Sequence, residues 1–185
     1  SAAMASQALP LGAAAATVPA APYLGRRSSG FILMPRPYPR IEAWRQLLIH
    51  EFFDAANSVA GIRGQNDSDY MVQNTIIYDG DVAGIRNNDA TANGIVENVT
   101  VYDMDEWGVL GTAGRLIVRN TISMGNPSGD FSGTMTQGYN LSSDLSATGS
   151  GAQTGLAAVD QFVSITPGSE NLHLKTGSLA IDTAY

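Results

Sequence analysis

VQNTIIYD at residues 72–79 recurs as VENVTVYD at residues 96–103 and as VRNTISMG at residues 118–125. The asparagine of this pattern is therefore spaced by 24 and then by 22 residues. A second marker, a glycine followed by an aliphatic residue, lies between these segments at Gly61, Gly84 and Gly108. Two interleaved markers that share one period indicate a solenoid of stacked repeats.

Each repeat alternates apolar and polar residues, is rich in β-branched side chains and is broken by Gly, Asn or Asp. This pattern is typical of short strands that are joined by tight turns. The leucine-rich signature of other solenoids with a similar period is missing. We therefore predict an all-β fold, a short right-handed parallel β-helix.

Stacking of successive coils places equivalent residues about 4.8 Å apart, the normal spacing of strands. We predict an internal ladder of hydrogen-bonded amides at Asn74, Asn98 and Asn120. An aliphatic column should stack beside it at Val72, Val96 and Val118. A further core column is expected at Ile76, Thr100 and Ile122.

Three regions follow from composition. Residues 1–40 are predicted to be an arm or linker, because they are rich in alanine and interrupted by prolines such as Pro10 and Pro19. This arm fits neither a signal peptide nor a membrane span. Residues 41–185 are expected to form the β-helix domain. Within it, a stretch of Gly, Ser, Thr and Asn predicts an irregular loop at residues 126–160.

The start of the domain, residues 41–53, is compatible with two structures. Counting back from Gly61 places Glu51 at the ladder position and Phe53 two residues further on, as in a degenerate first coil. Apolar residues at helical spacing also fit an amphipathic helix that covers the edge of the first coil. We favour the strand.

Charge and composition exclude several functions. The formal net charge is −7 and Lys175 is the single lysine, which disfavours binding to a nucleic-acid backbone. Without cysteine there is no disulfide framework, no thiol nucleophile and no Cys-ligated zinc. No phosphate-binding loop, dinucleotide fingerprint or nucleophile elbow is present, and we predict no cofactor and no metal.

The end of the chain carries a resemblance. FVSITPGSENLHLKTGSLAID at residues 162–182 resembles the closing motif of right-handed β-helix repeat proteins of phage particles and bacterial surfaces. Those proteins typically have proline where this chain has Leu179. DFSG at residues 130–133 and GYNLSSD at residues 138–144 are similar to the phage and environmental branch. The likeness covers about residues 60–185 and implies the fold together with a virion or extracellular location.

We therefore expect a structural surface module, such as a phage decoration, fibre or spike component that attaches to a scaffold protein or a host surface, rather than an enzyme. A short solenoid has two open ends, so we expect a homo-oligomer such as a trimer. The alternatives are a polysaccharide lyase or depolymerase that acts on bacterial surface glycans, and a bacterial adhesin fragment.

Five residues are candidates for ligand binding, and none is assigned a catalytic role. Arg63 and Arg86 occupy equivalent positions in successive coils and suit an acidic sugar or the carboxylates of a partner. Asp79 and Asp103 are also equivalent and, at about 5 Å, suit calcium or a retaining glycosidase pair. Trp107, beside an acidic turn, suits stacking on a sugar ring. The alternative is a column of solvated turns.

Overall fold

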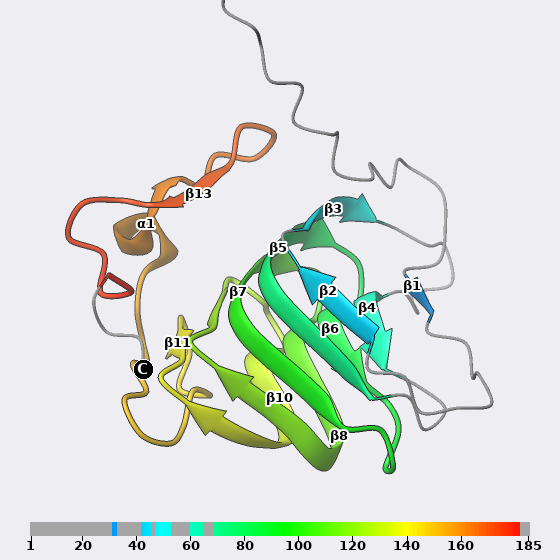
Figure 1. Cartoon of the computed structure of the whole chain (residues 1–185). Helices are drawn as coiled ribbons and strands as arrows, with labels where there is room; N and C mark the ends of the chain where they lie inside the picture. The colour runs from blue at the N-terminus through cyan, green and yellow to red at the C-terminus, as the bar shows by residue number, and fades with distance from the viewer. Residues whose placement is uncertain (1–30, 33–41, 46, 53–59, 65–68, 182–185) are drawn as a thin grey trace, which may run out of the picture.

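The computed structural model describes residues 31–32, 42–45, 47–52, 60–64 and 69–181, so the arm predicted at residues 1–40 lies almost wholly outside the described residues. Within them the chain is nearly all β (Figure 1). In chain order the elements are β1 (Phe31–Ile32), β2 (Glu42–Arg45), β3 (Leu48–Phe52), β4 (Ala60–Gly64), β5 (Tyr70–Gly80), β6 (Ala83–Asn87), β7 (Gly94–Met104), β8 (Trp107–Arg119), β9 (Ile122–Met124), β10 (Gly129–Gly138), β11 (Leu141–Ser142), α1 (Ala158–Gln161), β12 (Phe162–Ser164) and β13 (Asn171–Leu174).

Parallel strands stack coil upon coil and confirm the predicted β-solenoid, with about three turns. Val72 in β5 lies opposite Val96 in β7, and β7 in turn pairs with β8 and β9. The β4, β6 and β8 strands pair along another side of the coil. We name the three sides of the coil by residues 70–73 (face A), 76–80 (face B) and 83–87 (face C), each with its register partners.

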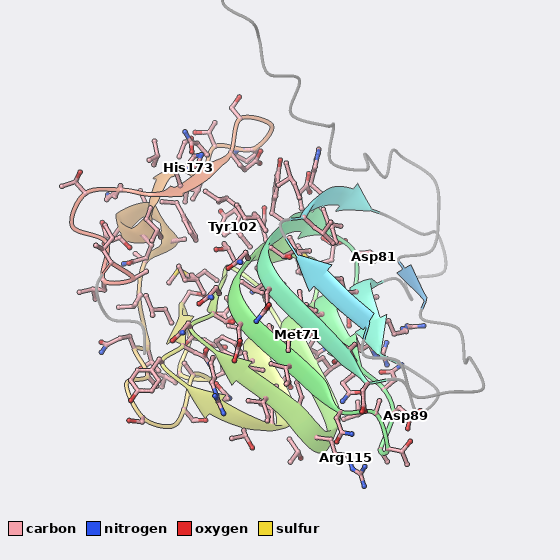
Figure 2. The ribbon with its side chains drawn as sticks, viewed as in Figure 1. Met71, Asp81, Asp89, Tyr102, Arg115 and His173 are labelled. Carbon is pink, nitrogen blue, oxygen red and sulfur yellow. The ribbon has the colours of Figure 1, made fainter. Side chains whose placement is uncertain are left out.

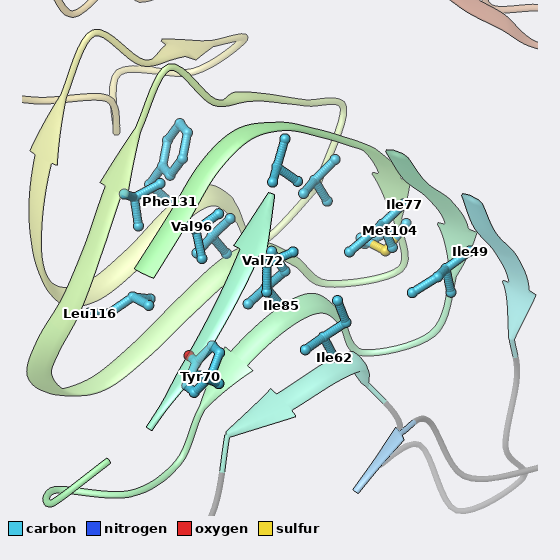
Figure 3. Packing of buried hydrophobic residues seen from close by; sticks show 14 of the residues in the cluster. Ile49, Ile62, Tyr70, Val72, Ile77, Ile85, Val96, Met104, Leu116 and Phe131 are labelled. Carbon is cyan, nitrogen blue, oxygen red and sulfur yellow. The ribbon is translucent and has the colours of Figure 1, made fainter. Parts of the chain in front are cut away.

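Aliphatic side chains from the three faces meet inside the coil and form the main core (Figure 3). The predicted column of Val72, Val96 and Val118 is confirmed, because all three side chains are fully buried and lie opposite one another. Face C adds a second column of Ile62, Ile85 and Val109. Burial of each aliphatic side chain stabilises the fold by about 1.5–3 kcal/mol.

Residues in the left-handed conformation turn the chain from face A to face B. Asn74, Asn98 and Asn120 have φ angles of 50°, 54° and 49°. Asparagine tolerates this conformation better than most residues, which explains the asparagine of the repeat. The three residues do stack in register, but the predicted internal ladder is wrong, because the side chains of Asn74 and Asn98 are exposed.

The left-handed corner also changes which side chains face inward. Val72 is buried on face A, but beyond Asn74 the buried residues are Thr75 and Ile77. The second predicted core column is stacked as expected, at Ile76, Thr100 and Ile122. However, it lies on the outer side of face B, because strict alternation applies only within a regular strand.

The recurring glycine marks a place where face C comes close to face B inside the coil. A Cβ atom on Gly84 would overlap the side chain of Val101, and one on Gly108 would overlap the hydroxyl of Ser123. An interior packed at this density has no room for an added methyl group. The second marker of the repeat is therefore a steric requirement.

Tyr70 fills the interior at the start of β5 (Figure 3), although nothing in the repeat marked it as a core residue. A side chain on either Gly64 or Gly94 would overlap its ring. The hydroxyl of Tyr70 is buried without a hydrogen-bond partner among the described residues, and burial raises the pKa of Tyr70. The two glycines thus make space for one large aromatic side chain.

The first coil is a strand region, as we favoured, since β2 and β3 pair in parallel with β5. The predicted register is wrong, because Leu48 rather than Phe53 lies opposite Ile76. Leu48 precedes Ala60 by 12 residues, whereas Ile76 precedes Ala83, the partner of Ala60, by 7 residues. Five additional residues between faces B and C therefore disrupt the period in the first coil.

Residues 126–160, which we predicted to be an irregular loop, instead contain a further coil. The β10 strand pairs with β8, and β11 pairs with β9. Tyr139, with a φ angle of 57°, occupies the corner position 19 residues after Asn120. The register shifts within β10, so this coil is shorter than the others. The shorter period and the tyrosine at the corner concealed the repeat.

Residues 143–153 run along the edge of β10 and β11 and cover it. Ala147 is buried in the main core. The fully buried carboxylate of Asp130 accepts hydrogen bonds from the backbone N of Ser143 (2.6 Å), from its Oγ (2.7 Å) and from Nδ2 of Asn126 (2.7 Å). The prediction of an open edge is wrong at this end, because the chain covers the edge itself.

The C-terminal segment, residues 156–181, contains α1 and the antiparallel strands β12 and β13 (Figure 1). Oε1 of Gln161 accepts hydrogen bonds from Oγ of Ser178 (2.8 Å) and from the backbone N of Leu179 (2.9 Å). A second apolar cluster joins the segment to the outer side of face B through Tyr102, Ile122, Met124, Leu141, Phe162 and Leu172. Among the described residues no helix is long and apolar enough to cross a membrane.

Candidate functional site

Arg63 and Arg86 lie side by side on face C. They are register partners on the neighbouring parallel strands β4 and β6, as their spacing predicted, and both side chains are half-buried. Burial of the guanidinium group, followed by the positive charge of Arg86, lowers the pKa of Arg63. The two arginines are therefore a concentrated positive charge on a chain that is negative overall.

Asp79 and Asp103 form the corner between faces B and C. Their φ angles are 51° and 56°, and the register places them in adjacent coils. Burial, followed by the negative charges of Glu170 and Asp105, raises the pKa of Asp103. Aspartate tolerates the left-handed conformation, so the turn alone explains this residue type. In the described ranges no group of three or more His, Asp or Glu side chains is arranged to hold a metal ion.

Trp107 packs on the protein itself. Its half-buried ring contacts a small apolar cluster of Ala60, Val82 and Ala83. A Cβ atom on Gly129, the register partner of Trp107, would come within 3.2 Å of the ring. These contacts account for the tryptophan as a packing residue, and its predicted stacking on a sugar ring stays a prediction.

The sequence did not predict a hollow between the outer side of face B and the C-terminal segment. It has a volume of about 360 Å³ and is lined by Leu48, Ile76, Tyr78, Glu170, Asn171, Leu172 and His173. The ring of Tyr78 stacks on His50, with ring centroids 5.0 Å apart and planes 6° apart. In Figure 2, His173 lies on the C-terminal segment, across from the solenoid.

A second hollow, of about 230 Å³, lies along the corner between faces A and B. Its lining includes the corner residues Asn98, Asn120 and Tyr139, with Leu174 and Ala180 from the C-terminal segment. The asparagines of the repeat thus contribute polar groups to a surface depression as well as turning the chain. None of the five predicted ligand residues lines either of these two hollows.

Negative charge gathers where the C-terminal segment meets the solenoid, at Glu170 and Asp103. The carboxylate of Glu170 raises the pKa of both Tyr102 and Asp103, in each case after the larger effect of burial. These hollows combine aromatic rings, amides, imidazole and carboxylate, which are groups that bind polar ligands. The signal that could have indicated the larger hollow is the reversed alternation after Asn74, which turns Ile76 and Tyr78 outward.

Apolar exposure is concentrated on the C-terminal segment. Seven large hydrophobic side chains are exposed in the described ranges, and five of them lie in this segment. These five are Val159, Val163, Leu174, Leu179 and Ile181, with exposed fractions between 39% and 56%. On a soluble protein, gathered apolar exposure marks surfaces that contact a partner.

The fold defines the class of this protein as a parallel β-solenoid. No family model, no curated protein and no solved structure matches the chain. The likeness to β-helix repeat proteins of phage particles and bacterial surfaces therefore depends on the motifs quoted above. A fold alone assigns no activity, so function has to be inferred from the surface.

Proposed function

We propose that this chain is a structural attachment module of a virion or an extracellular surface, and that it binds further copies of itself and its scaffold through the C-terminal segment. The observation that carries the proposal is the apolar exposure of this segment. Five exposed large hydrophobic side chains lie between Val159 and Ile181, whereas the rest of the described residues expose two, Leu48 and Leu145. Covering them with a partner stabilises an assembly by removing apolar area from water.

The small sheet of this segment supports the same proposal. Within the part of the chain that the structure describes, the β12 and β13 strands pair only with each other, and a two-stranded sheet is marginally stable without further packing. By contrast, the edge of the last coil is already covered by residues 143–153. The C-terminal segment is therefore the better surface for a neighbouring subunit.

Sedimentation equilibrium on the full chain tests this proposal. We expect the wild type to form an oligomer, and the double variant Val163→Ser/Leu179→Ser to be monomeric with its fold retained. Leu145→Ser is the matched control, because Leu145 is 82% exposed but lies outside the segment. A monomeric wild type at high concentration, or a double variant that still assembles, contradicts the proposal.

The second candidate is a polysaccharide lyase or depolymerase, and the paired arginines on face C are the observation that favours it. Incubation with acidic polysaccharides, with and without calcium, followed by ultraviolet absorbance of unsaturated ends, distinguishes the two functions. The attachment proposal predicts no cleavage. The double variant Asp79→Asn/Asp103→Asn keeps residues that suit the left-handed corners. Cleavage by the wild type that is lost in this variant would support the lyase and contradict the attachment function. A bacterial adhesin fragment is a form of the attachment function on a different carrier.

A further inference from the structure

Outside the C-terminal segment, one of the two large hydrophobic side chains that the described residues expose lies in the larger hollow. Leu48, with an exposed fraction of 45%, lines this hollow together with Ile76 and Tyr78. The other, Leu145, belongs to the residues that cover the last coil. The floor of the hollow comes from β3 and β5, and β13 forms the opposite wall (Figure 1). Exposed apolar side chains of the described residues are therefore found mainly on two surfaces, the segment and this hollow.

The hollow continues the contact between the segment and the outer side of face B. Ile76 and Ile122 lie in one column there, and both belong to the second apolar cluster. At Ile122 the column is buried in the same cluster as Phe162 of the segment, whereas at Leu48 and Ile76 it is partly exposed. The volume of about 360 Å³ lies within the roughly 300–1,000 Å³ of pockets that bury small molecules, so it accommodates a few side chains. Apolar side chains placed there would extend the cluster and remove more apolar area from water.

Val163 cannot fill the hollow of its own molecule. Phe162 packs in the second cluster, on the solenoid side of β12. Successive side chains of a strand point to opposite sides, so the exposed Val163 faces away from the solenoid. The hollow, by contrast, opens between the segment and the solenoid. Only another copy of the chain can bring this side of the segment to it.

The charges of the two surfaces are complementary. Lys175, the single lysine, lies on the segment beside Val159: its Nζ donates to the backbone O of Val159 (2.7 Å), and its side chain is 39% exposed. Its ion pair with Asp160 is long, at 3.7 Å, and such exposed pairs contribute little. The hollow carries the carboxylate of Glu170, and burial followed by this negative charge raises the pKa of Asp103. Lys175 of a neighbouring copy would offset the negative charge at the hollow.

We propose that exposed apolar side chains on the C-terminal segment of one copy insert into the hollow of the next copy, against Leu48, Ile76 and Tyr78. The inference rests on the attachment function proposed above and names the surface that receives the segment. The contact is heterologous, because the surface that is inserted differs from the surface that receives it. Each copy in a closed ring gives one segment and receives one, so a small ring covers all of these surfaces.

Sedimentation equilibrium of the full chain with a blocked hollow tests this contact. In Leu48→Arg the arginine stem should occupy the hollow of its own chain, with its charge beside Glu170 and against the Lys175 of a neighbour. We expect self-association to weaken by about tenfold or more, with an unchanged circular dichroism spectrum. Leu145→Arg is the matched control, because it places the same charge on an exposed leucine outside both surfaces, and it should associate as the wild type does.

Mixing two variants shows whether segment and hollow contact each other. Leu48→Arg retains an intact segment, and Val163→Ser/Leu179→Ser retains an open hollow. Each should be monomeric alone, and an equimolar mixture should form a complex of two chains, because one productive contact remains between them. This complementation also excludes misfolding of Leu48→Arg as the cause of its dissociation.

The outcomes separate this inference from the attachment function. If Leu48→Arg assembles as the wild type does while Val163→Ser/Leu179→Ser is monomeric, the attachment function stands, but the segment contacts another surface and the inference is overturned. A mixture that stays monomeric also overturns it. A monomeric wild type at high concentration contradicts the attachment function itself, and the inference with it.

Discussion

In the solenoid, equivalent residues of successive coils stack, whereas in the C-terminal segment no position repeats. Val96 is covered by Val72 on one side and Val118 on the other, so each layer supports the next. The C-terminal segment instead depends on contacts that occur once. Hydrogen bonds to Gln161 link its two ends, and the second apolar cluster, with the edge-to-face rings of Tyr102 and Phe162 at a centroid distance of 5.9 Å, joins it to the solenoid. Repetition makes the solenoid cooperative, and we expect the segment to open locally at a lower free energy.

The largest predicted change in the free energy of unfolding distinguishes the solenoid from the C-terminal segment. Leu116→Ala removes a fully buried side chain from the main core and should lower the free energy of unfolding by about 2–5 kcal/mol. Leu172→Ala, in the second cluster, should loosen the C-terminal segment and leave the urea midpoint of the solenoid nearly unchanged. Urea titration followed by circular dichroism measures the first effect, and limited proteolysis the second. Equal shifts of the midpoint would show that the two regions unfold as one unit.

A smaller effect is expected where the solenoid ends. Asp130→Ala removes the acceptor of the hydrogen bonds from Ser143 and Asn126, leaves buried donors unsatisfied and should cost about 1–3 kcal/mol. Urea titration is again the measurement. The control is Asp160→Ala, because the Asp160 side chain is 69% exposed and its ion pair with Lys175 is long, at 3.7 Å. If both variants cost the same, the buried carboxylate does not hold the covering residues in place.

The smallest effect concerns the contact between the regions. Asp103→Asn keeps a residue suited to the left-handed corner and removes repulsion from Glu170 and Asp105, so it should stabilise the protein by a few tenths of a kcal/mol at neutral pH. Asp103→Ala should instead destabilise it by about 1 kcal/mol, because alanine is strained there. Thermal unfolding measures both variants.

The stabilisation expected for Asp103→Asn depends on pH in a definite direction. The folded-state pKa of Asp103 is raised, so the ionised carboxylate is unfavourable in the folded protein above that pKa. The advantage of Asp103→Asn over the wild type should therefore be largest at neutral pH and should disappear as the pH falls below the ordinary range of aspartate. An advantage that grows on acidification would contradict this electrostatic explanation.

The stacked part of the fold could be predicted because its physics repeats. The spacing of Asn74, Asn98 and Asn120 was sufficient for the solenoid and for the column of Val72, Val96 and Val118. The predictions that were wrong concern local features. The internal asparagine ladder was wrong because alternation was assumed to continue through the asparagine corners. The first and last coils were misread because inserted residues in the first coil and the shorter last coil changed the period.

The candidate sites were predictable to a lesser degree. The neighbouring positions of Arg63 and Arg86 followed from the period, and the register confirms them. The hollow beside Tyr78 could not be predicted from the period, because its other wall, with Glu170 and His173, belongs to a segment outside the repeat. Contacts between a repeat and a non-repeating segment leave no periodic signal in one sequence.

The most direct test of the attachment function is hydrogen exchange of the full chain at two protein concentrations that differ by about a hundredfold. Association through the C-terminal segment predicts that amides of β12 and β13 exchange more slowly at the higher concentration, while amides around Val96 in the solenoid exchange equally at both. Exchange of β12 and β13 that does not depend on concentration would contradict the account.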